Sequence, residues 1–248
     1  MAEKQKFPSE VVDLPSGGTI YGSDSPLKDG KIEIKYMTAK EEDILTSQNL
    51  IKKGVVIDKL LDSLILTEGV KSDDLLIGDK NAVMVAARVL AYGPDYNTEV
   101  PNPSTGTSLQ HTFNLTDCPF KVLPKDVDYS KNEFDFELPT TKHKIKFHLI
   151  TGADERLIGK ELDALKKSGI SAEITTRLRH SIISVDDDND KSKINNFVNN
   201  MLARDSIAFR EELKRIAPDI DMSQEIDIEG ESVTVDIPMT VGFFWPKS

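Results

Sequence analysis

Histidine and cysteine are the first residues to consider for metal chemistry. The closest pair of histidines is separated by an odd number of residues, so on a regular strand the two side chains would face opposite sides. The lone Cys118 excludes an internal disulfide, and without a second cysteine a zinc site has no obvious ligands. Beside Pro119 and Phe120, this thiol is expected to be a small buried hydrophobe. The histidines, which we expect to bind no metal, are His111, His143, His148 and His180.

Two further segments have partial ligand-binding patterns. The acidic run 186–190 alternates carboxylates as calcium loops do, but Lys191 and Phe197 stand where such a loop needs glycine and glutamate. A solvated turn before a helix is the better interpretation. The segment IGDKNA has a glycine and a lysine but lacks the glycine-rich cradle of a phosphate-binding loop. Gly78 is therefore interpreted as a break before a helix that Asp79 caps.

Carboxylates are the remaining candidates for catalysis. Glu133, Asp135 and Glu137 occupy alternate positions of one predicted strand, so they are expected to form its solvent-facing side. A hydrolase would instead need two carboxylates on opposite sides of a cleft, roughly 5 to 10 Å apart. We therefore expect no catalytic residue, no cofactor and no enzymatic activity. The alternative is a cell-wall hydrolase, which an activity assay would detect.

Two features indicate residues that need a binding or packing partner. Phe243, Phe244, Trp245 and Pro246 place large aromatics near the C-terminus, and such residues dominate protein interfaces. They either dock on a partner or fill the protein's own core. Arg88 lies in a strongly apolar segment, where an unpaired charge is expensive, so we expect it to form a structural ion pair with a carboxylate.

The overall charge limits the classes of partner. The formal net charge is -11, which disfavours phosphate backbones, so nucleic acid is not an expected partner. The apolar runs are shorter than the roughly 20 residues of a membrane-spanning helix, and the first residues lack the apolar core of a signal peptide. We expect a soluble protein made in a cytoplasm.

Hydrophobic periodicity predicts two groups of helices. Thr38 and Glu41 have the spacing of a capping box for a helix over 39–47. A leucine-rich stripe over 57–65 and an apolar helix from Asp79 to Gly93 follow, and the second should be central and well covered. Further helices are predicted from about 154 to Gly169, over 194–202 and over 206–217, and the ambiguous segment ITTRLRHSIISV is also interpreted as a helix.

Strands are predicted at both ends and in the middle of the chain. Period-two alternation or turn punctuation indicates strands at 11–14, 19–21, 32–36 and 233–237, with a hairpin over 133–150. The fold class is therefore α+β. The predicted organisation is an N-terminal β arm (1–37), a helical cluster (38–95), a β-rich region (96–150), a second helical cluster (151–218) and C-terminal strands with an aromatic tail (219–248), in one or two compact domains.

Several segments resemble the baseplate hub protein family of T-even-like contractile-tailed bacteriophages, in family order and over most of the chain. They are LPSGGTIYG, YMTAKEEDILTSQNLIKKGVVIDKLLDSLI, LLIGDKNAVMVAARVLAYGPDY, TTRLRHSIISV, NMLARDSIAFREELKRIAPDID and IPMTVGFFWP. Some relatives carry a cysteine pair in the last strands, where this chain has EIDIEGESV, so no metal role is carried over. The motif positions that do carry over are Thr38, Glu41, Asp79, Arg88, Tyr92 and Phe243 to Pro246.

The resemblance implies a non-enzymatic structural protein of the baseplate hub, located in the virion tail and made in the cytoplasm of the host bacterium. Its implied partners are other hub and tail proteins and the tape measure, and an oligomer is compatible with it. The alternative is a transient chaperone of tail assembly that is absent from the finished virion.

Overall fold

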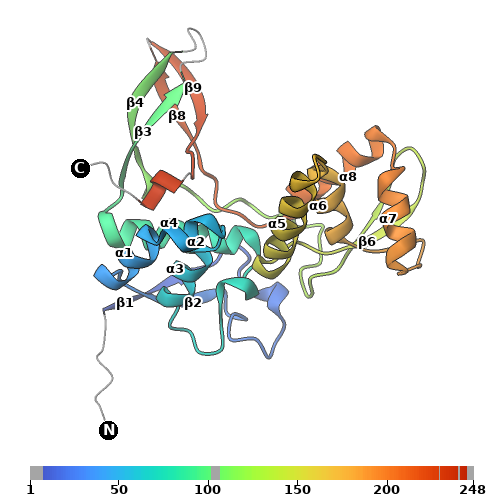
Figure 1. The fold of residues 1–248 in the computed structure, drawn as a ribbon, viewed down its shortest axis with the longest axis horizontal. Helices are drawn as coiled ribbons and strands as arrows, with labels where there is room; N and C mark the ends of the chain where they lie inside the picture. Colours follow the sequence, from blue (N-terminus) through green and yellow to red (C-terminus); the bar gives the residue numbers. More distant parts are fainter. Residues whose placement is uncertain (1–7, 102–106, 229, 240, 245–248) are drawn as a thin grey trace.

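The computed structural model describes residues 8–101, 107–228, 230–239 and 241–244, and these form three lobes (Figure 1). A first helical body contains the N-terminal part of the chain. A pair of two-stranded β-ribbons projects from it, and a second helical lobe lies beside it. The mixture of helices and small antiparallel sheets confirms the predicted α+β class.

The first helical body combines a short ribbon with a set of packed helices. Strands β1 (Ser9–Asp13) and β2 (Lys31–Lys35) pair antiparallel, with Val12 opposite Ile32. The helices are α1 (Ala39–Thr46), α2 (Gln48–Lys52), α3 (Val56–Leu64) and α4 (Ile77–Tyr92), with short 3-10 turns at Thr19–Tyr21 and Ser72–Asp74.

Helices α3 and α4 form the centre of this body. The predicted stripe on α3 is confirmed, since Leu60, Leu61 and Leu64 are fully buried. Helix α4 is covered on several sides, as its apolar composition predicts, and it ends at Gly93, whose φ is positive. Its position makes it the element that the ribbons and the second lobe both contact.

We call the two projecting ribbons the ribbon lobe. One ribbon is β3 (Asp95–Pro101) with β4 (Ser108–Asn114), and the other is β8 (Ser223–Ile228) with β9 (Glu231–Asp236). Alternate residues of both ribbons are buried in one cluster, which includes Tyr96, Val100, Phe113, Ile226, Ile228 and Val235. The intervening residues face outward, so each ribbon has one apolar and one polar face.

The second lobe is built on a three-stranded sheet in the order β5 (Phe134–Glu137), β6 (Lys144–Phe147), β7 (Ile182–Val185). The β5–β6 hairpin confirms the predicted one, with Phe134 opposite Phe147. The helices of this lobe are α5 (Gly152–Lys167), α6 (Glu173–Ser181), α7 (Lys191–Asn199) and α8 (Ala203–Ile216).

The buried side chains form two clusters, one for each helical part. The first cluster joins α3 and α4 to the ribbon lobe and to the 3-10 turn at Val241–Phe244, so the C-terminal segment completes a core begun by the N-terminal half. The second cluster is centred on Phe147 and Phe209 and is drawn mostly from residues 134–216.

Two segments form another type of secondary structure than predicted, and the helix predicted over 194–202 ends early, since α7 stops at Asn199. Residues 19–21 form a 3-10 turn instead of a strand, because Gly18 and Gly22 flank them with positive φ and bend the chain. A side chain at Gly18 would also collide with the backbone of Leu27 and Lys28. The segment ITTRLRHSIISV is a helix only up to Ser181; its β-branched end continues as β7, which pairs with β6.

Candidate interaction surfaces

The capping box at the start of α1 is present and belongs to a larger buried network. One oxygen of Glu41 accepts hydrogen bonds from the Thr38 backbone N–H at 3.0 Å and the Thr38 hydroxyl at 2.6 Å. The other oxygen accepts from the Lys35 ammonium and the Ser63 hydroxyl, each at 2.7 Å. Burial alone would raise the pKa of Glu41, but these donors hold it at about 2. The residue therefore ties β2 and α3 to α1.

Asp79 does not cap α4, contrary to the prediction. The helix begins at Ile77, so Gly78 lies inside it and is not the break that we predicted, and Asp79 lies in its first turn with no exposed surface. Its carboxylate accepts hydrogen bonds from the Ser16 backbone N–H at 2.9 Å and the Tyr21 hydroxyl at 2.5 Å. Burial raises the pKa of Asp79, and burial beside this carboxylate also raises the pKa of Tyr21. The helix dipole stabilises an acid in the first turn, but the hydrogen bonds of Asp79 go to the N-terminal loop and hold that loop against α4.

Arg88 has carbonyl partners instead of the carboxylate that we expected. Its Nε donates to the Phe243 carbonyl at 2.9 Å, and its two terminal nitrogens donate to the carbonyls of Gly93 and Asp95 at 3.1 and 3.2 Å. The guanidinium lies over the rings of Tyr92 and Tyr96, at 5.1 and 5.8 Å from their centroids. The planar guanidinium presents several donors at once, so it satisfies the Gly93 carbonyl at the end of α4 together with one carbonyl of β3 and one of the 3-10 turn at Val241–Phe244. Burial lowers the pKa of Arg88.

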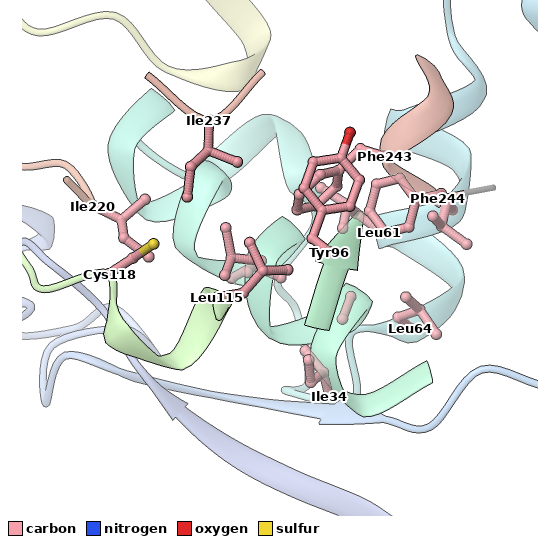
Figure 2. Close-up of a cluster of buried hydrophobic side chains, with 14 of the residues drawn as sticks. Ile34, Leu61, Leu64, Tyr96, Leu115, Cys118, Ile220, Ile237, Phe243 and Phe244 are labelled. Carbon is pink, nitrogen blue, oxygen red and sulfur yellow. The ribbon is translucent and has the colours of Figure 1, made fainter. Parts of the chain in front are cut away.

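The first two aromatics of the C-terminal run fill the protein's own core. Phe243 and Phe244 are each only 1% exposed. Figure 2 shows them in the first cluster, where the ring of Phe243 meets that of Tyr96 edge-on at 5.0 Å. Of the two alternatives for these aromatics, Phe243 and Phe244 therefore fill the core and do not form a docking tail. Trp245 and Pro246 lie outside the described residues.

Sequence reasoning missed two long-range polar contacts. Asp205, at the start of α8, is fully buried and accepts hydrogen bonds from the backbones of Thr140 and Thr141, at 2.8 and 3.1 Å, in the β5–β6 turn. Despite burial, these donors lower the pKa of Asp205. Lys121 donates to carbonyls at the end of α8, including that of Ala217 at 3.0 Å. The sequence around Asp205 and around Lys121 does not indicate a partner so far along the chain.

An apolar groove lies where the first body meets the second lobe. Its volume is about 580 Å³, and its walls include Ile57 and Met84 from the first body and Leu149 and Leu213 from the second lobe. Lys80 and Arg177 also line it, and each is already paired, with Asp58 and Glu155 respectively. The groove is therefore lined by apolar side chains and by these paired charges.

The metal and carboxylate candidates have ordinary structural partners. His143 lies 2.6 Å from Asp186, and His180 lies 3.1 Å from Glu161. Among the described residues, no three acids, histidines or cysteines come close enough together to hold a metal ion. Asp190 caps α7, as a solvated turn before a helix would, and the carboxylates of β5 face solvent.

A family model described as T4 bacteriophage base plate protein matches residues 9–245. The chain belongs to this family. As a baseplate protein it has its place in the tail of the virion, among other phage tail proteins. The match spans both helical parts and the ribbon lobe, so the whole described fold is the family's unit. No curated protein and no solved structure matches the chain. No helix in the described part of this baseplate protein is long and apolar enough to cross a membrane.

Proposed function

We propose that this baseplate protein is a non-enzymatic structural component of the baseplate hub of a contractile tail, and that it acts through contacts with neighbouring hub proteins. The observation that carries the proposal is the family match over residues 9–245. The segments that resemble hub proteins support the finer proposal of a position in the hub.

The shape of the molecule supports a role in contacts. Three lobes meet at α4, which leaves long surfaces on each lobe for neighbouring proteins (Figure 1). Large apolar side chains stay about half exposed on the second lobe, among them Leu157, Ile170 and Ile174. Single exposed hydrophobics are normal, but these three lie on α5, on α6 and in the loop between them, where they add to a surface that a neighbour could cover.

Quantitative mass spectrometry of purified virions and of infected-cell lysates tests the proposal. A structural hub protein is expected in mature virions at a fixed ratio to other hub proteins. Abundance in the lysate with absence from virions would instead identify a transient chaperone for the tape measure or a hub protein. A peptidoglycan-release assay checks the proposed lack of enzymatic activity, and release above that of a heat-treated sample would contradict it.

A further inference from the structure

The ribbon lobe has open strand edges. Each of β3, β4, β8 and β9 hydrogen-bonds along its length to one neighbour only, in two separate two-stranded sheets. In the part of the chain that the structure describes, each ribbon thus keeps two edges whose backbone groups can pair with another strand. Strand addition to such an edge is a recurring way for proteins to bind extended segments.

The charge of this lobe is of one sign. Residues 89–120 and 216–246, which contain both ribbons, include no lysine and no arginine. The same two segments contain ten acids, so they account for almost all of the net charge of -11. These acids are Asp95, Glu99, Asp117, Asp219, Asp221, Glu225, Asp227, Glu229, Glu231 and Asp236.

Five of these acids are exposed on the outward faces of the ribbon strands. On β8 and β9, Glu225 and Asp227 are exposed on the same face as Asp236, because Ser223 is opposite Asp236 and Glu225 is opposite Thr234. On β3 the exposed acids are Asp95 and Glu99. The ribbons project away from the helical body, so the acids face solvent (Figure 1).

The charge and the open edges together indicate the kind of partner. Two copies of this lobe would bring acids against acids, which disfavours pairing between copies. A strand with lysine or arginine at alternate positions would place cations beside the acids while its backbone paired with an edge. Because the two segments contain no lysine or arginine, a basic partner would meet no like charge from either residue type there.

We propose that the ribbon lobe is the docking surface for an extended lysine- and arginine-rich segment of another tail protein, which adds as a strand to one ribbon edge. This inference names the partner chemistry of the proposed hub role and rests on that role for the partner's location. The helices of the second lobe do not share this acidic excess, since residues 151–218 contain twelve acids and twelve lysines or arginines.

Binding of a fluorescent peptide of alternating lysine and threonine, followed by anisotropy, tests the proposal on the full chain. The ribbon variant combines Asp95→Lys, Glu225→Lys and Asp236→Lys. The control variant combines Glu68→Lys, Asp163→Lys and Glu211→Lys, which are exposed acids outside the ribbon lobe and change the net charge equally. We expect the ribbon variant to bind about tenfold or more weakly than wild type, and the control to bind within about threefold of it.

Three outcomes would overturn the proposal. One is equal weakening in the ribbon and control variants, which would show an effect of net charge alone. Another is equal binding of a peptide that alternates lysine with proline, since proline removes backbone donors and cannot add as a regular strand. The third is wild-type binding by a ribbon variant with Asp95→Asn, Glu225→Gln and Asp236→Asn, which keeps the fold testable if the lysine variant does not fold.

The same variants in infected cells separate this inference from the proposed function. If all three proteins enter virions equally, the hub role stands and ribbon docking in the tail is wrong. If wild type itself is absent from virions, the hub role fails, and the peptide measurement still decides whether the ribbon lobe binds basic segments.

Discussion

Four donors surround the carboxylate of Glu41, and three elements depend on it. In Glu41→Gln the amide cannot balance the charge of Lys35, and one of its ends donates where the carboxylate accepted. Breaking a buried ion pair by removing one partner costs about 3 to 5 kcal/mol, so we expect a loss of about 3 kcal/mol in the free energy of unfolding. Urea denaturation at pH 7 measures this loss.

The same carboxylate predicts a pH dependence. Its pKa in the folded protein, about 2, lies below the ordinary value of 4.5, so its contribution to stability is complete above pH 4.5 and is lost as the pH falls toward 2. The loss of stability across this window should be up to about 3 kcal/mol smaller in Glu41→Gln than in wild type. Asp43→Asn, an exposed acid of the same helix, is the matched control. An unchanged pH profile in Glu41→Gln would contradict the role of this network.

At this scale, the sequence predicts what is local. The Thr38–Glu41 capping box is found because its partners are three residues apart and the geometry of a helix start fixes their contact. The farthest partners of Asp79 and Arg88 lie 63 and 155 residues away, at Ser16 and Phe243. Local spacing shows that such buried polar groups need partners, but only the tertiary fold decides which ones.

Two helix starts bring the first body and the second lobe together at glycines. A Cβ on Gly78 of α4 would lie 1.8 Å from the Pro218 carbonyl oxygen, and one on Gly152 of α5 would lie 2.2 Å from that of Ser72. Backbone carbonyls cannot swing aside as a side chain can. We expect Gly78→Ala and Gly152→Ala each to lower the free energy of unfolding by about 1 to 3 kcal/mol, measured by denaturant titration.

Gly159→Ala is the control for this pair. It lies inside α5, and a Cβ there would meet nothing within 4 Å. Alanine is favoured over glycine in a helix interior, so this substitution should stabilise the protein by about 0.5 to 1 kcal/mol. Similar small gains at Gly78 and Gly152 would show that the two lobes are not packed closely at these helix starts.

Elements with strong periodicity are the ones that the sequence predicts well. The leucine stripe of α3 and the apolar residues along α4 must be buried in any fold that this chain adopts, so their positions can be predicted from the sequence. The two errors occur where the local signal is weak or divided. At 19–21 the flanking glycines outweigh the strand propensity of the three residues. At 182–185 a helical segment continues directly into β-branched residues, and pairing with β6 makes these residues a strand.

At the scale of the whole molecule, the chain leaves its first core, builds the second lobe and then returns. Hydrophobic pattern identifies the segments that must be buried, but it does not say which distant segments share a core. The return is visible in the first cluster, where Phe243 and Phe244 pack with residues of α3 and β3 (Figure 2). The C-terminal aromatics could therefore be recognised as important, while their role as core residues required the structure.

Two truncations separate the core role of this segment from a docking role. Removing residues 243–248 deletes two buried phenylalanines and the carbonyl that accepts from Arg88. Losing one large buried aromatic costs about 3 to 5 kcal/mol, and whole domains are stable by about 5 to 15 kcal/mol. We expect this truncation to unfold the first helical body and the ribbon lobe, seen as lost helical circular dichroism and rapid proteolysis.

Removing only residues 245–248 retains both phenylalanines and should leave the unfolding free energy close to that of the full chain. Phe120→Ala is the matched control for the loss of an aromatic, because Phe120 is 41% exposed and its removal should cost less than about 1 kcal/mol. If the short truncation is stable but no longer enters virions, the segment 245–248, which contains Trp245 and Pro246, contacts a partner. If the long truncation is as stable as the short one, Phe243 and Phe244 do not hold the core together, and their burial serves some other purpose.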